Sequence, residues 1–168
     1  MKIKPQHIHF FMGVSCIASL VLAMYYFQTV IGLLACPLCV IQRIAYILIA
    51  VTALIAAAHR PVGAVKWLYT GLLALWSLAG GAVAGWQLWL IQNPHLAGCR
   101  ISPEEKFLNT LPLQKWWPDM FSANGDCTSV TWSLFGLSIP DLSFIFFVVL
   151  FLLTVFAAVI WKNTRVNR

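Results

Sequence analysis

Cys36 and Cys39 form a closely spaced pair of thiols, separated by only two residues. This spacing occurs in metal sites, haem attachment sites, structural disulfides and redox-active pairs. Haem attachment requires a histidine directly after the second cysteine, where this chain has Val40. A four-thiol zinc site usually combines two close pairs, whereas Cys99 and Cys127 are far apart in the sequence. We therefore expect no metal site, and interpret the pair as forming a disulfide.

The residues around this pair favour a reactive disulfide. Pro37 suits the first position of a helix, which would place Cys36 near the N-cap and Cys39 in the first turn. The partial positive charge at a helix N-terminus favours a thiolate. Arg43 adds a full positive charge one turn beyond Cys39, about 6 Å along the helix axis. Arg43 could instead extend to the lipid head groups. Because a charge within a membrane span is costly, we favour a functional role.

A purely structural role is the alternative for the four thiols. A disulfide between Cys36 and Cys39 would close almost no loop and would contribute little entropic stabilisation. Cys99 and Cys127 bracket a longer segment, where a disulfide would contribute about 3 kcal/mol in the loop-entropy model. The fifth cysteine, Cys16, lies in the middle of an apolar run, and we expect a small buried side chain there.

The composition places these residues in a membrane protein. Of 168 residues, 61% are hydrophobic and 10% are charged, against roughly 25% charged in soluble proteins. Four apolar runs, each about long enough to cross a bilayer, cover residues 10–34, 40–58, 67–91 and 142–161. Glycine and alanine in the third run, around Gly80, suit close helix packing. We predict an all-α polytopic membrane protein, a single four-helix bundle with one long outer loop.

The distribution of charge predicts the orientation of the bundle. Residues 1–9, 59–66 and 162–168 contain lysine and arginine but no acidic residue, whereas every acidic residue lies in 92–141. The positive-inside rule then places both termini and the 59–66 turn in the cytoplasm, with 35–39 and 92–141 outside. Basic residues at span ends, without a basic stripe, argue against nucleic-acid binding. In the outer loop we expect a short helix over 102–109 and an interfacial segment over 112–121.

These features together resemble the DsbB family of bacterial inner-membrane disulfide oxidoreductases. The resemblance covers nearly the whole chain. It rests on the four spans, the Cys-Pro-Leu-Cys sequence with Arg43 at the head of the second span, and two cysteines in a long outer loop. The Gly125-Asp126-Cys127 turn, followed by Trp132 and the Leu-Phe-Gly-Leu sequence at 134–137, is also typical.

The resemblance implies a role for each outward-facing thiol. It implies redox-active disulfides Cys36–Cys39 and Cys99–Cys127, in a protein that reoxidises the periplasmic thiol oxidase DsbA. Cys99 would form the mixed disulfide with DsbA, and the released Cys127 would exchange with Cys36. Cys39 would then contact a membrane quinone, ubiquinone or menaquinone, with Arg43 stabilising the charge.

Two further positions follow from the same resemblance. Gln42 occupies a place that is often acidic or polar in the family. A histidine near the outer end of the third span is linked to quinone in some members, and Gln92 and His95 are the nearest candidates here.

Three alternatives stay open. One is a specialised DsbB paralogue with a dedicated partner. Another is a protein similar to vitamin K epoxide reductase, although that family's cysteine pair comes later in its chain. The third is a non-enzymatic membrane protein with structural disulfides.

Overall fold

Four long helices dominate the computed structural model, which describes residues 5–33, 35–94, 116–121, 125, 127–128, 132–134 and 136–166. The elements are α1 (Pro5–Val21), the π-helical segment η1 (Leu22–Val30), α2 (Pro37–His59), α3 (Val65–Gln92), α6 (Pro118–Phe121), β1 (Ser133–Leu134), β2 (Leu137–Ser138) and α7 (Ile139–Val166). In this part of the chain, four segments are long and apolar enough to cross a membrane: Pro5–Val30, Pro37–His59, Val65–Gln92 and Ile139–Trp161. The predicted all-α, four-helix membrane fold is confirmed.

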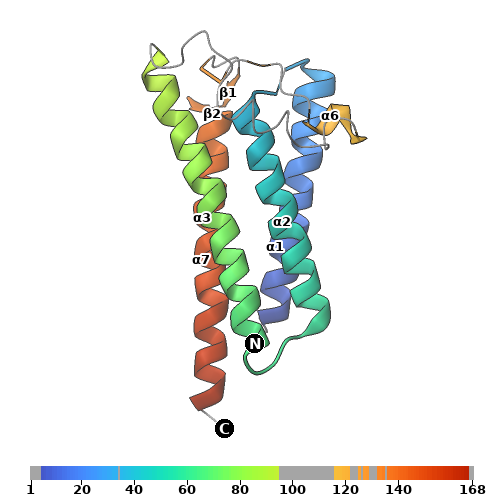
Figure 1. Ribbon diagram of the computed structural model, residues 1–168, viewed down its shortest axis with the longest axis vertical. Coiled ribbons are helices and arrows are strands. Elements are labelled where there is room, and N and C mark those ends of the chain that lie inside the picture. The colour runs from blue at the N-terminus through green and yellow to red at the C-terminus, as the bar shows by residue number, and fades with distance from the viewer. Residues whose placement is uncertain are drawn as a thin grey trace.

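The four helices lie side by side in one bundle (Figure 1). The main contacts join α1 to α2, α2 to α3 and α3 to α7, whereas α1 and α7 touch much less. The beginning of α1, the turn between α2 and α3 and the end of α7 lie at one end of the bundle. The N-terminus of α2, the antiparallel β1–β2 hairpin and α6 lie at the opposite end. The cysteine pair is therefore far from the described ends of the chain.

Close contact between α3 and α7 depends on a glycine. A Cβ atom at Gly80 would overlap the ring of Phe147, which leaves no room for a side chain at this position. Phe147 is in turn stacked on Tyr46 of α2, with ring centroids 4.4 Å apart and an interplanar angle of 3°. The expectation of close packing at the glycine-rich part of α3 is confirmed at Gly80.

The outer end of the first span is π-helical, which the sequence did not predict. The backbone N–H of Ile31 donates to the carbonyl of Tyr26 at 3.0 Å, and the Thr29 hydroxyl donates to the Met24 carbonyl at 3.1 Å. A π-helix is wider than an α-helix and occurs frequently at functional sites. Here it carries Gln28, which contacts Arg43 of α2 at 3.1 Å.

The interfacial prediction for 112–121 is wrong in its last two residues. Met120 and Phe121 are buried in the hydrophobic core, with exposed fractions of 4% and 8%. Burial of these two side chains removes apolar surface from water, and the Met120 carbonyl accepts a hydrogen bond from Arg43 of α2. Trp116 and Trp117 are exposed, as an interfacial segment requires. The helix expected over 102–109 and residues 112–115 of the interfacial segment lie outside the described residues.

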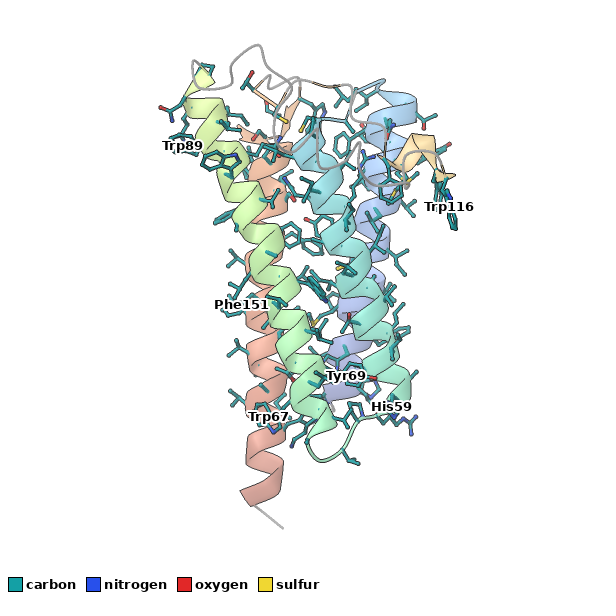
Figure 2. All side chains as sticks on the ribbon, in the orientation of Figure 1. His59, Trp67, Tyr69, Trp89, Trp116 and Phe151 are labelled. Carbon is teal, nitrogen blue, oxygen red and sulfur yellow. The ribbon has the colours of Figure 1, made fainter. Side chains whose placement is uncertain are left out.

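Aromatic side chains mark both ends of the bundle. Figure 2 shows Trp67 and Tyr69 near the end with the α2–α3 turn, and Trp89 and Trp116 near the end with the hairpin. Lys66 is buried between two rings, 5.7 Å from Trp67 and 5.8 Å from Trp161. Tryptophan and tyrosine at both ends are typical of the two interfaces of a bilayer.

Candidate functional site

Cys36 is the N-cap of α2, as predicted. Its backbone is extended, with φ −84° and ψ 161°, and Pro37 follows within the first helical turn. The Cys36 sulfur accepts a hydrogen bond from the backbone N–H of Cys39 at 3.3 Å. One sulfur thus satisfies an N–H group that the helix leaves without a partner. The helix N-terminus fixes Cys36 and points its positive end at the thiol pair.

The two thiols of this pair are in contact, and a third thiol reaches them. The sulfurs of Cys36 and Cys39 are 2.9 Å apart, with Cys36 as the donor. The thiol of Cys127 forms a hydrogen bond with Cys36. The backbone at Gly125 helps to hold this segment, because its N–H donates to the carbonyl of Ala35 at 2.9 Å. Three of the four predicted redox cysteines are therefore brought together.

The environment of the pair distinguishes Cys36 from Cys39. Hydrogen bonds with Cys127 and Cys39, followed by burial, raise the pKa of the Cys36 thiol above its ordinary value. Cys39 accepts the S–H of Cys36 and is partly exposed. The arrangement keeps the proton on Cys36 and leaves Cys39 as the sulfur to carry a negative charge.

Arg43 lies one turn further along α2, where its side chain is buried with 6% exposure. Its Nη1 donates to the Gln28 side chain at 3.1 Å and to the Met120 carbonyl at 3.0 Å. Its Nε is buried and has no acceptor among the residues that the structure describes. A buried donor without a partner is costly in a protein interior, so this N–H is suited to a ligand oxygen.

A cavity of about 410 Å³ adjoins the thiols and the arginine. Cys39, Gln42, Arg43 and Tyr46 of α2 line one side of it. The other walls are mainly apolar and come from α1, η1, α7 and the segment before the hairpin, including Leu20, Ala23, Phe27, Trp132, Pro140 and Phe146. A largely apolar cavity with a few convergent polar groups is typical of a small-molecule site.

Gln87 of α3 belongs to this site, and the sequence analysis did not identify it. Its amide nitrogen donates to the sulfurs of Cys36 at 3.3 Å and Cys39 at 3.4 Å. Its amide oxygen accepts a hydrogen bond from Gln42 at 2.8 Å. Both glutamines are buried, with exposed fractions of 3% and 4%. A signal was available, because both amides lie inside predicted spans, where polar groups need partners.

The other sequence candidates lie elsewhere. Gln92 is exposed at the end of α3, and the structure records no contact between it and the thiols. Cys99 and His95 lie outside the described residues. Cys16 is fully buried in α1, which confirms its expected burial.

Comparison with known proteins gives consistent matches over most of the chain. The model of a family described as "Disulfide bond formation protein DsbB" matches residues 5–157. A protein of Nitrosomonas europaea named "Disulfide bond formation protein B" is 49% identical over 150 residues, which cover 89% of this chain and 90% of the relative. Proteins of the same name are 54% identical over 122 residues in Nitrosomonas eutropha (73% and 75% coverage) and 42% identical over 157 residues in Ralstonia nicotianae (93% and 96%).

Proposed function

Because the chain belongs to the DsbB family of disulfide bond formation proteins, we propose that it reoxidises a DsbA-like periplasmic thiol oxidase and passes the electrons to a membrane quinone. Family membership supports a thiol–disulfide oxidoreductase in a multi-pass membrane protein. The single observation that carries the finer proposal is the contact of three thiols, Cys127, Cys36 and Cys39, beside the cavity that contains Arg43.

Electrons enter through the outer cysteines. A thiolate of the reduced partner attacks the Cys99–Cys127 disulfide at Cys99 and releases Cys127. The second thiol of the partner then attacks the mixed disulfide, so that the partner leaves oxidised and Cys99 is a thiol. The contact between Cys127 and Cys36 supports the next exchange.

The inner pair receives the electrons by a further exchange. Cys127 attacks Cys36 in the Cys36–Cys39 disulfide, and Cys39 leaves as the thiolate. Cys99 then attacks Cys127, which restores the Cys99–Cys127 disulfide and leaves Cys36 and Cys39 reduced. The position of Cys39 in the first turn, near Arg43, suits a leaving group that carries negative charge.

The residues of the cavity fit a quinone. A quinone has an apolar ring and carbonyl oxygens, and the cavity combines apolar walls with the buried Nε–H of Arg43. The quinone, ubiquinone or menaquinone, supplies an acceptor for two electrons and two protons. Cys39 provides the electron-rich sulfur beside the cavity, and Arg43 stabilises negative charge there.

The proposed location is the bacterial inner membrane, with both termini in the cytoplasm and the redox thiols on the periplasmic side. Support comes from the basic residues of the 59–66 turn and from the position of the Cys36–Cys39 pair at the N-terminus of α2, which lies at the opposite end of the bundle. Disulfides persist in the oxidising periplasm, which is where such a relay is useful.

Oxidation of reduced DsbA by the purified protein, with and without ubiquinone, tests this function. We expect multiple turnovers only with the quinone, and acid quenching followed by mass spectrometry should show Cys36 and Cys39 alternating between bonded and reduced. Cys16→Ala, which removes a thiol outside the site, should turn over like the wild type. If Cys36 and Cys39 stay bonded throughout turnover, the relay is wrong and the disulfides are structural.

A further inference from the structure

A hydrogen-bonded chain of polar side chains connects three helices to the thiol pair. Tyr46 and Gln42 come from α2, Ser143 from α7 and Gln87 from α3. The Tyr46 hydroxyl and the Ser143 hydroxyl are 2.8 Å apart. Ser143 contacts Gln42 at 2.5 Å, and Gln42 contacts Gln87 at 2.8 Å. We call the run Ser143–Gln42–Gln87 the amide chain.

The hydrogen bonds of the amide chain all point the same way, from Ser143 towards the sulfurs. The Ser143 hydroxyl donates to the Gln42 oxygen, so the Gln42 NH₂ group faces Gln87 and donates to its oxygen. The Gln87 NH₂ group then faces the sulfurs of Cys36 and Cys39. Hydrogen-bonded groups aligned in this way polarise one another, and the positive end of the amide chain lies against the thiols.

Satisfying buried amides would by itself explain contacts between the two glutamines. It does not explain why the amide chain ends on sulfur. A thiol is a weak acceptor, whereas hydrogen bonds to an ionised acceptor are about twice as strong as those between neutral groups. The arrangement therefore gains most when one sulfur is a thiolate. Cys39 is that sulfur, because it also accepts the S–H of Cys36 at 2.9 Å. While Cys39 is a thiol, its own S–H faces the Gln87 oxygen at the longer distance of 3.8 Å, so the shorter contact with the Gln87 NH₂ group, at 3.4 Å, is the one that a thiolate strengthens.

We propose that Ser143, Gln42 and Gln87 are positioning residues that stabilise the Cys39 thiolate and thereby make the Cys36–Cys39 disulfide a stronger oxidant. This inference rests on the proposed function, in which Cys39 donates electrons to the acceptor. A device that stabilises the reduced form raises the reduction potential of the pair. A more oxidising inner pair then draws electrons from Cys127 more readily.

The other groups around the sulfurs are few. Arg43 of α2 and Cys127 are the further titratable or charged partners that the structure records there. The carboxylate of Asp141, in the first turn of α7, accepts hydrogen bonds from the backbone N–H and the hydroxyl of Ser138. The amide chain thus acts on Cys39 together with the S–H of Cys36, the N-terminus of α2 and the charge of Arg43.

The reduction potential of the Cys36–Cys39 pair tests the inference without any quinone. The full chain, with Cys99→Ala and Cys127→Ala, is equilibrated with glutathione redox buffers in quinone-free nanodiscs, acid-quenched and analysed by mass spectrometry. Gln87→Leu should weaken the pair as an oxidant about tenfold, a shift of about 30 mV to more negative potential. Ser143→Ala, which removes one half-buried oxygen, should shift the potential about threefold in the same direction. Ser143→Thr should restore it.

Ser77→Ala is the matched control. Ser77 is a buried serine of α3 whose hydroxyl has no partner among the described residues, and its removal should leave the potential unchanged. Potentials of Gln87→Leu and Ser143→Ala equal to that of Ser77→Ala would overturn the inference. A shift in potential in Gln87→Leu with none in Ser143→Ala would also overturn it, because Ser143 would then have no effect on the sulfurs through Gln42 and Gln87. A failure of the wild type to turn over with quinone would instead refute the proposed function. The measurement of the reduction potential uses no quinone and does not depend on that turnover assay.

Discussion

Arg43 brings a positive charge to the outer end of a bundle that has few charges in its spans. Its Nη1 is held by Gln28 and by the Met120 carbonyl, so the side chain is fixed before any ligand binds. The guanidinium needs no rearrangement to stabilise charge in the cavity, and such preorganised groups contribute strongly to catalysis.

Arg43→Ala should therefore slow quinone reduction by about a hundredfold, since loss of one preorganised donor typically has an effect of this size. Exchange with reduced DsbA, which involves the outer thiols, should change far less. Stopped-flow measurement of the two half-reactions separates these effects. Arg60→Ala, at the exposed opposite end of α2, is the control. Equal loss in both half-reactions would indicate a folding role for Arg43.

The two thiols of the Cys36–Cys39 pair should differ in reactivity. Because its pKa is raised by Cys127, by Cys39 and by burial, Cys36 should keep its proton at neutral pH and react slowly with iodoacetamide in the reduced protein. Cys39 should be labelled first. The labelling rate of Cys36 should increase only as the pH rises above the ordinary range of a thiol. Cys127→Ala removes one hydrogen bond and should increase the rate at a given pH. Mass spectrometry of labelled peptides measures both rates, and equal rates at neutral pH would contradict the assignment.

The helices place these residues through close contacts that tolerate little change. Gly80 lets α3 approach the Phe147 ring of α7, and Phe147 stacks on Tyr46, whose hydroxyl contacts Ser143. The packing of α3 against α7 is therefore coupled to the site, and the position of Gln87 depends on it.

Gly80→Ala should destabilise the protein by about 1–3 kcal/mol, because the new methyl group overlaps a ring that cannot move without disturbing the stack with Tyr46. The matched control is Gly71→Ala on the same helix, where, apart from the helix's own neighbouring backbone, no atom of the described residues lies within 4 Å of the added Cβ. Gly71→Ala should be neutral or stabilising by up to about 1 kcal/mol, since alanine favours helix more than glycine does. Thermal unfolding in detergent distinguishes the two. Equal melting temperatures would show that α3 and α7 separate easily.

The Cys36–Cys39 pair lies at the N-terminus of α2, at one end of the bundle, and the basic turn between α2 and α3 lies at the other. This asymmetry supports the proposed orientation and gives a direct test of it. Trp116 is 87% exposed near the thiol end, and Val62 is 81% exposed in the turn between α2 and α3.

Single cysteines at these two positions, in a chain whose native cysteines are replaced by alanine, should differ in labelling by a membrane-impermeant maleimide. In spheroplasts Trp116→Cys should be labelled and Val62→Cys should be protected. After the membrane is permeabilised, both should react. Labelling of Val62→Cys in intact spheroplasts would reverse the proposed topology.

The sequence by itself determined the class of fold and the place of the Cys36–Cys39 pair at the start of the second span. Spans depend on the apolar character of contiguous residues, and a helix start depends on Pro37 and its neighbours. Both are local properties, so the four-helix membrane fold and the N-cap position of Cys36 were predictable. The family resemblance added the proposed roles of the thiols.

Only the tertiary structure decided which distant residues share the site. Gln87 lies 48 positions from Cys39, and Ser143 lies 101 positions from Gln42, yet they meet in one hydrogen-bonded chain. Tertiary packing also explains three further features: the contact of Cys127 with Cys36, the π-helical position of Gln28 and the burial of Met120. Such contacts arise from the packing of whole helices, because packing brings together residues that are far apart in the sequence. Buried amides signal that they need partners, but only the assembled bundle shows that the partners are the sulfurs.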